Sequence, residues 1–512
     1  MKKLKLFAFI ILSIVILSSC SKDNGVNYIP EDAVIVVKVN TSKIVKDAFL
    51  DFASETNLIT DLLNSFPEYS DFAEAGIDEI NQFYFFAQIP SIEKSNLAAV
   101  IPLKDQDLFK KFIENRFKTT IENQNSYDYV TINGKYVITW NKKMALFYYS
   151  DNLNLSIVSD ALKIIDKDIV SITTKGELFN QFNDSEDHVL VWVNNLNNSI
   201  LKDKLADLNL PKDDVHSFTS INFNNGKIDI QSKSYYSNEN SILKNVFNND
   251  KSIDSLLKSS GSEEPLLVAS VALNLNGIVD FLNANEELYN NLQANVPFVN
   301  IKDFISMFSG DFLLTFNGVE EEVVQFYDEK IIDGILEVVP DEKIVKTPYL
   351  TYAIGLNDSK KLIEMLQPFL GMIPYEFTKK TNEAIVFETD EEYHVSLQKN
   401  ILFLGTSSKA RKLIRNMNGT LSTNFKDKIS QYPFYFYANI DGLAQTIKDK
   451  DNEEVMDLVS ATFSKFELNE YVVDKNEISA GLSLEFKNEE NSLLQLIKFY
   501  SLFSKINKNQ IL

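Results

Sequence analysis

The chain has 512 residues, 45% of them hydrophobic and 12% aromatic, so it can bury a sizeable core and is not a disordered stalk. Acidic residues outnumber basic ones by 72 to 50, for a formal net charge of −22. Binding to nucleic acid, or to an anionic lipid surface, depends on an excess of Lys and Arg, so this balance argues against both. The excess of acidic residues is best explained by solubility.

Residues 1–19 are predicted to be a lipoprotein signal peptide. Three lysines precede an apolar run, Leu6–Leu17, which only Ser13 interrupts, and this pattern is typical of a secretory leader. At about 1.5 Å per residue the run is too short for a bilayer core of roughly 30 Å, which disfavours a transmembrane anchor. Its ending, Leu-Ser-Ser-Cys at residues 17–20, resembles the lipobox of bacterial lipoproteins. That resemblance implies cleavage before Cys20 and acylation of Cys20, for example with palmitate.

Cys20 is the only cysteine, so no intramolecular disulfide can form, and we expect it to be the lipidation site. Residues 20–26 read as a polar, lipid-anchored linker. Lys22 and Asp23 resemble the signal that sends some Gram-negative lipoproteins to the cell surface. We therefore expect anchoring to the outer membrane of a Gram-negative cell, with the periplasmic and cell-surface faces both open. Without the three leader lysines, 47 basic residues face 72 acidic ones, a balance of −25.

The folded part opens with a β-branched strand, Ala33–Val39, after which Asn40 can cap a helix. Next come a buried strand from Ala98, a capping carboxylate at Asp105, and a helical stripe that ends at Phe117. A hairpin, a further strand and an alternating strand pair follow; they span residues 136–149, 189–193 and 218–232.

The same elements recur in the same order later in the chain. Asn274 follows Leu267–Leu273, Asp358 follows a strand from Leu350, and the later elements reappear at 393–405, 434–438 and 478–484. The offsets between matched positions fall between 234 and 257 residues. Five matches in register indicate duplication of one unit, and we predict repeat domain one at 27–250 and repeat domain two at 262–500. Because most strands follow one another as hairpins, we expect an α+β fold of two tandem homologous domains, each a mostly antiparallel sheet with helices packed on one face.

The opening motif also carries a family resemblance. The lipobox cysteine, then Ile29–Ala33 with its strand, then Asn40 and its helix resemble an uncharacterised Bacteroidota-type lipoprotein family, the domain of unknown function numbered 4836. Its shared motifs are structural, and the resemblance implies no catalytic residues.

No catalytic, cofactor-binding or metal-binding residues are predicted. No two of the three histidines, His188, His216 and His394, have helical zinc spacing. His188 and His216 each follow two acidic residues and could contact a metal, but a solvated histidine in a hydrated loop is expected for both. The acidic run at 449–454 lacks the glycine of a calcium loop and should face solvent. Neither a phosphate-binding glycine loop nor a G-x-S-x-G nucleophile motif is present in the sequence.

Three aromatic clusters stand in predicted strands, at Phe83–Phe86, Phe147–Tyr149 and Phe434–Tyr437. Alternate rings in a strand face opposite sides of the sheet, so one set belongs to the core. We expect helices to cover the other set, whereas exposure would mark a binding surface. The sequence favours a non-enzymatic binding or interaction module, with a glycan, lipid or protein ligand held in a groove between the domains. The alternatives are an envelope hydrolase that uses a carboxylate pair, and a purely structural assembly partner.

Overall fold

The computed structural model describes residues 25–44, 46–47, 75–78, 81–91, 94–124, 127–151, 157–175, 177–194, 215–236, 246–247, 253–258, 261–297, 299–332, 335–370, 377–380, 385–388, 394–416, 419–472 and 477–511. The chain forms two compact units. Unit 1 comprises Met1–Lys202 and His216–Asn222, and unit 2 comprises Asp203–Val215 and Phe223–Leu512. Within the described residues, no helix combines the length and the apolar character needed to cross a membrane. Cys20 and the predicted leader lie outside the described residues.

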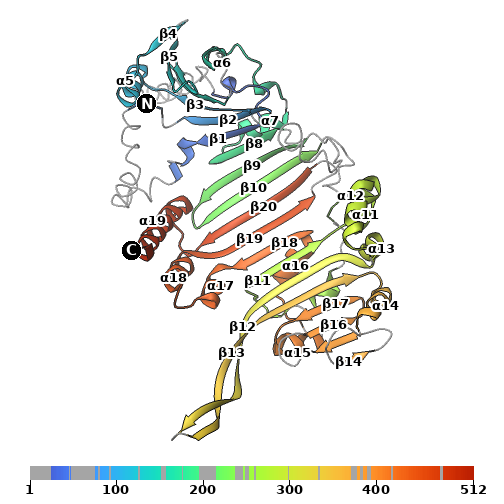
Figure 1. Ribbon diagram of the computed structural model, residues 1–512. Coiled ribbons are helices and arrows are strands. Elements are labelled where there is room, and N and C mark those ends of the chain that lie inside the picture. Colours follow the sequence, from blue (N-terminus) through green and yellow to red (C-terminus); the bar gives the residue numbers. More distant parts are fainter. Residues whose placement is uncertain are drawn as a thin grey trace, which may run out of the picture. The chain divides into compact units, whose positions relative to one another are not determined.

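Unit 1 is built on one antiparallel sheet (Figure 1). Its strands pair in the order β9–β8–β1–β2–β3–β7–β6–β5–β4. They are β1 (Ile35–Asn40), β2 (Gln82–Ser91), β3 (Lys94–Pro102), β4 (Glu122–Gln124), β5 (Tyr127–Ile132), β6 (Tyr136–Trp140), β7 (Met144–Ser150), β8 (Val189–Asn194) and β9 (Val215–Asn224). The helical elements are η1 (Gly25–Tyr28), α5 (Gln106–Phe117), α6 (Ile157–Ile165), η2 (Ile172–Lys175) and α7 (Glu177–Asp184).

Helices pack on both faces of this sheet. On the core face, the row Val36–Phe86–Ala98–Tyr148–Val137 is buried together with residues of α6 and α7 such as Ile164 and Phe179. On the opposite face, Phe109 and Ile113 of α5 pack against Trp140. The α+β class and the antiparallel sheet are confirmed. The prediction that helices pack on only one face of the sheet was wrong for unit 1. The reason is that α5 is amphipathic and its stripe of Phe109 and Ile113 needs a surface of its own.

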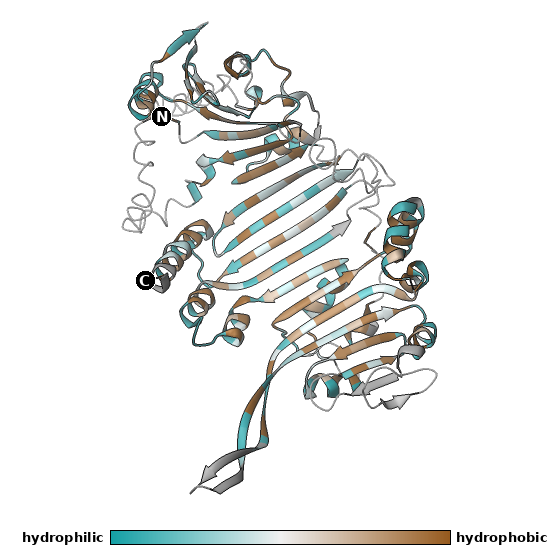
Figure 2. Ribbon diagram, in the orientation of Figure 1, coloured by the Kyte–Doolittle hydropathy of each residue, from teal (hydrophilic) through white to brown (hydrophobic). Residues whose placement is uncertain are grey.

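Unit 2 repeats this plan of strand pairing. Its order is β10–β20–β19–β18–β11–β12–β13–β17–β16–β15–β14, all antiparallel. From β18 onward, each strand has the place that its counterpart has in the run β8–β1–β2–β3–β7–β6–β5–β4 of unit 1. Alternating apolar and polar residues along β19 and β20 appear as bands in Figure 2. Duplication of one ancestral unit, with limits at 27–250 and 262–500, stays a prediction.

The strands of unit 2 are β10 (Lys227–Tyr236), β11 (Leu267–Ala272), β12 (Phe308–Ile332), β13 (Ile335–Leu356), β14 (Phe377–Lys380), β15 (Ile385–Glu388), β16 (His394–Gln398), β17 (Ile401–Gly405), β18 (Phe434–Asn439), β19 (Phe463–Val472) and β20 (Glu477–Phe486). Its helices are α10 (Asp254–Leu257), α11 (Leu275–Ala284), α12 (Glu286–Asn295), α13 (Ile301–Ser306), α14 (Ser359–Leu370), α15 (Ser408–Asn416), α16 (Thr423–Gln431), α17 (Ile440–Ile447), α18 (Glu453–Thr462) and α19 (Ser492–Ile511).

The predicted helix caps are confirmed. Asp105 accepts hydrogen bonds from the amides of Asp107 and Leu108, both at 2.9 Å, and Asp358 accepts one from Lys361 N at 2.9 Å. The asparagine caps recur in the same way, since Asn40 and Asn274 each accept from the amide three residues on. These contacts satisfy amides that a helix start leaves unpaired.

Strand β13 begins well before Leu350, where the sequence predicted its start, and it pairs with β12, which the sequence did not predict. β11 pairs with β12 only as far as Phe316, and β17 pairs with β13 only from Thr351 onward. Beyond these residues, β12 and β13 pair with each other from Val319–Pro348 to Ile332–Ile335 and form a two-stranded ribbon that projects from the sheet of unit 2 (Figure 1). Glutamate and proline are disfavoured in strands, so the glutamates at 320–322 and the two prolines of this segment gave no strand signal in the sequence.

Candidate functional site

An apolar groove lies on the face of the unit 1 sheet opposite the buried row. Strand register places two rows of side chains on this face across β1, β2, β3, β7 and β6. Every member is apolar or aromatic; the rows are Val37–Phe85–Ala99–Phe147–Ile138 and Ile35–Ala87–Leu97–Tyr149–Tyr136. With Phe117 and Ile132, these rows line a groove of about 640 Å³, here called the aromatic groove.

The groove is open because α5 covers only part of this face. Its Phe109 ring meets Phe147 edge-on at 6.1 Å, and the helix ends at Phe117 because Lys118 adopts a left-handed conformation with φ 47°. On the part of this face that α5 does not cover, Phe85 is 39% exposed and Leu97 is 49% exposed. Large contiguous apolar surface is unusual on a monomeric protein and marks a binding surface. The volume also falls within the roughly 300–1,000 Å³ of small-molecule sites.

One end of the groove has a polar rim. The rings of Tyr136 and Tyr149 lie 4.8 Å apart, and the Tyr149 hydroxyl donates a hydrogen bond to the Asp151 carboxylate. Ser95 Oγ donates to the same carboxylate at 2.8 Å. The hydrogen bond to Asp151 raises the pKa of Tyr149, while the bonds from Tyr149 and Ser95 lower the pKa of Asp151. Tyr149 therefore stays neutral at pH 7, and a carboxylate stands at the mouth of an otherwise apolar surface.

The predicted aromatic clusters divide between groove and core. Phe85 of the first cluster, and Phe147 and Tyr149 of the second, line the aromatic groove. The expectation that helices cover these rings was wrong for Phe85, which is 39% exposed, whereas Phe147 packs against Phe109 of α5. In the third cluster, Tyr435 is fully buried and Phe436 packs against Phe466 with ring centroids 5.9 Å apart. Sequence reasoning missed the groove because β2, β3 and β7 become neighbours only in the folded sheet.

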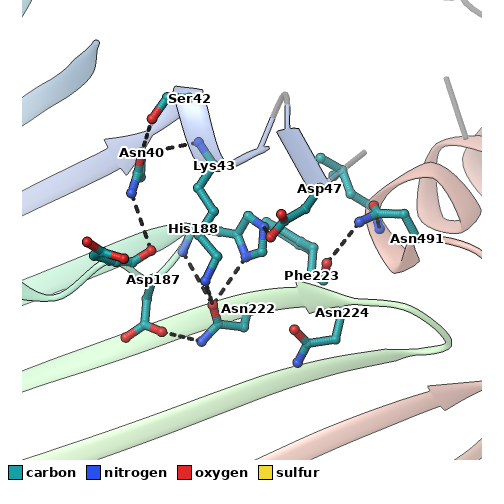
Figure 3. A network of polar contacts seen from close by, with 12 residues as sticks. Asn40, Ser42, Lys43, Asp47, Asp187, His188, Asn222, Phe223, Asn224 and Asn491 are labelled. Atoms are coloured by element: carbon teal, nitrogen blue, oxygen red, sulfur yellow. Dashed lines mark hydrogen bonds and ion pairs between the residues drawn. The ribbon is translucent and has the colours of Figure 1, made fainter. Parts of the chain in front are cut away.

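A second polar feature of unit 1 surrounds His188 (Figure 3). His188 Nε2 lies 3.1 Å from Asp47 Oδ2, and its Nδ1 lies 3.2 Å from Asn222 Oδ1, which also accepts from Lys43 Nζ at 3.4 Å. Asn222 Nδ2 donates to Asp187 at 2.6 Å. This network ties the helical turn after β1 to β8 and β9.

The His188 ring is 1% exposed, and burial, followed by the charge of Lys43, lowers its pKa despite Asn222 and Asp47. His394 is likewise 1% exposed, and His216 stacks on Trp192 at 5.7 Å. The prediction of a solvated histidine was therefore wrong for His188, whose ring is buried. A neutral, enclosed imidazole serves packing and is closed to a substrate.

Metal and carboxylate chemistry find little support in the part of the chain that the structure describes. It holds no cluster of three or more His, Cys, Asp or Glu side chains arranged for a metal. The acidic residues of 449–454 are exposed, as predicted, and Asp449 accepts backbone amides of its own turn. Burial raises the pKa of Glu470, but its cross-strand neighbours are Phe434 and Ala480. A carboxylate pair of the glycosidase kind does not form there.

Comparison with known proteins gives a family and weak structural likenesses. No curated protein matches the chain. Three solved structures resemble it, crystal forms I, IV and III of TP0453, each at 10% identity. They cover 43%, 42% and 42% of this chain and 81%, 81% and 80% of theirs, with TM-scores of 0.26, 0.25 and 0.24, levels that support no inference. A family model, Domain of unknown function (DUF4836), matches residues 26–327. Because this match spans more than half of the sequence, the chain belongs to the DUF4836 family.

Proposed function

We propose that unit 1 is a binding module whose aromatic groove takes an acyl chain. The observation that carries the proposal is the pair of five-residue rows, in which no side chain is charged or carries an amide. Five strands about 4.8 Å apart make the rows about 19 Å long, which suits an extended chain better than a compact ligand. A peptide strand would leave backbone polar groups unpaired on such a surface.

The proposed setting supplies the same ligand. We propose that the protein is held at the outer membrane of a Gram-negative cell through acylated Cys20, as the lipobox and the family resemblance suggest. Acyl chains are then the most abundant apolar groups near the groove. The polar rim at Asp151 and Ser95 would face the end of the ligand that stays in water.

Binding of fatty acids of increasing length to the mature chain with Cys20→Ser tests the proposal. Each methylene that enters the groove should add about 0.8 kcal/mol, or roughly fourfold in affinity, until the chain outgrows the rows. Ala99→Trp places an indole between Phe85 and Phe147 and should abolish the gain with length. Ile344→Trp, on the exposed ribbon of unit 2, is the matched control and should bind as the parent does. Affinity independent of chain length, or undiminished in Ala99→Trp, would contradict the proposal.

A further inference from the structure

A separate pocket of about 690 Å³ opens on the core face of the unit 1 sheet, on the side away from the aromatic groove. Its floor holds Gln88, Asn96 and Tyr148, which share this face because Gln88 pairs with Asn96, and Asn96 pairs with Ser150, two residues after Tyr148. One wall comes from α6, with Asp160 and Lys163, and the other from the turn of Glu31 and Asp32. We refer to it as the acidic pocket.

The walls are fixed by hydrogen bonds rather than by loose loops. Glu31 N donates to Val170 O at 2.8 Å, and Pro30 forms a β-bridge with Ser171. Gln88 Nε2 donates to Asp32 Oδ1 at 2.6 Å, which joins the turn to the floor. The pocket is thus a built part of the fold.

The charge of the pocket is negative. Three carboxylates, those of Glu31, Asp32 and Asp160, face one ammonium group, that of Lys163, which leaves a net charge of −2. Lys163 Nζ stands 3.9 Å from Asp160 Oδ1, at the outer limit of an ion pair. Concave surfaces lined by charge of one sign concentrate ligands of the opposite sign.

The hydroxyl of Tyr148 supplies an independent sign of a ligand. Tyr148 is 3% exposed and lines the pocket, yet among the described residues its hydroxyl has no hydrogen-bond partner. Tyr84, on the same face of β2, instead donates to Gln82 at 2.8 Å. Burial, then the charges of Asp160 and Asp32, raise the pKa of Tyr148, so the hydroxyl stays neutral beside both carboxylates. The hydroxyl is reached from the pocket, so a ligand that carries a donor would hydrogen-bond to it there.

We propose that the acidic pocket binds a small organic cation that carries one or two ammonium groups. An ammonium group offers three donors, which match the Tyr148 oxygen and the carboxylates of Asp160 and Asp32. The pocket is much larger than a bare metal ion, and the described residues form no metal-binding cluster. Ile164 and Ile169 give the carbon skeleton of such a ligand an apolar wall.

Ligand-observed saturation-transfer NMR on the full mature chain tests this, with 1,4-diaminobutane and 1,4-butanediol as probes of equal length. The diamine should bind at least tenfold more tightly than the diol. Asp160→Asn should weaken diamine binding about tenfold, and Tyr148→Phe should weaken it several-fold at unchanged thermal stability, because no bond within the described residues is lost. Asp451→Asn makes the same change of charge at an exposed site in unit 2 and should leave affinity unaltered.

Three outcomes would overturn the inference. Equal binding of diol and diamine would show that charge does not select the ligand. An effect of Asp451→Asn as large as that of Asp160→Asn would show that the diamine binds because of the net negative charge of the chain and not because of the pocket. No measurable binding of the diamine would remove the site altogether. Fatty-acid binding should be unaffected by Asp160→Asn, which separates this inference from the acyl-chain proposal.

Discussion

Substitutions at two adjacent phenylalanines of β2, Phe85 and Phe86, should affect ligand binding and the stability of unit 1 separately. Phe86 is 3% exposed within the core cluster, whereas Phe85 points to the opposite face and is 39% exposed in the aromatic groove. Truncating a buried Phe to Ala costs about 3–5 kcal/mol of unfolding free energy, because transfer and cavity terms add. For Phe85 about three-fifths of the side chain is buried, so about 1–2 kcal/mol is expected.

Tryptophan fluorescence during urea unfolding is the assay of choice. The chain has two tryptophans, Trp140 and Trp192, and both lie buried in unit 1, so the signal reports this unit. Phe86→Ala should lower the unfolding midpoint far more than Phe85→Ala does. Phe85→Ala should weaken fatty-acid binding about tenfold, since roughly 1.4 kcal/mol of contact is lost. Equal destabilisation by the two variants would show that the groove face is covered, which would contradict the exposure of Phe85 in the aromatic groove.

Three further predictions follow from the caps, a buried carboxylate and the leader. Asp105→Ala and Asp358→Ala should each lower the unfolding free energy of their own unit by about 1 kcal/mol, because a helix cap is lost. Asp107→Ala, in the first turn of α5, is the control and should have a smaller effect. Equal effects of Asp105→Ala and Asp107→Ala in thermal melts would count against capping. Burial opposes the ionisation of Glu320, but hydrogen bonds from Lys409 N and Ser408 Oγ outweigh burial and lower the pKa of this carboxyl group. The stabilisation from ionised Glu320 should therefore be complete above the pKa of the unfolded chain, about 4.3, and should be lost as the pH falls through the pKa of the folded protein. In Glu320→Gln, the melting temperature of unit 2 should therefore fall less steeply as the pH is lowered. An unchanged dependence of the melting temperature on pH would refute this. Mass spectrometry of the native protein should find acyl chains on Cys20, and Cys20→Ser should move the protein out of the membrane fraction; an intact, unmodified N-terminus would disprove the anchor.

Local patterns in the sequence predicted most of the strands and the capped helices, because interactions between neighbouring residues determine them. The hairpin at Tyr136–Trp140 and Met144–Tyr149 matches β6 and β7 to within a residue, and Asp105 begins α5 as its carboxylate requires. Period-two alternation also divides each strand into two faces. In β1 it puts Val37 and Ile35 on one side and Lys38 on the other.

Alternation does not say which face becomes the core, and β1 shows why. The hydrophobic Val37 faces the groove, whereas Lys38 is 1% exposed on the core face, where it donates to Asn183 O at 2.5 Å and Ser185 O at 2.9 Å. Burial lowers the pKa of this lysine, although Asp184, Asp187 and Glu186 partly offset the effect. The carbonyl groups that make its burial tolerable come from the end of α7, about 145 residues away in the chain, and no local pattern announces them.

The sequence by itself determined most of the strands, the helix starts that follow an Asp or Asn cap, the α+β class and the candidate lipidation site, since each depends on neighbouring residues. Only the tertiary structure decided that α5 stops short of covering the sheet, that ten apolar side chains from five strands form one groove, and that Tyr148 opens into an acidic pocket. These features depend on which distant segments meet. Pairing between strands and the placement of helices are cooperative, so they emerge from the packing of the whole unit rather than from any one stretch of it.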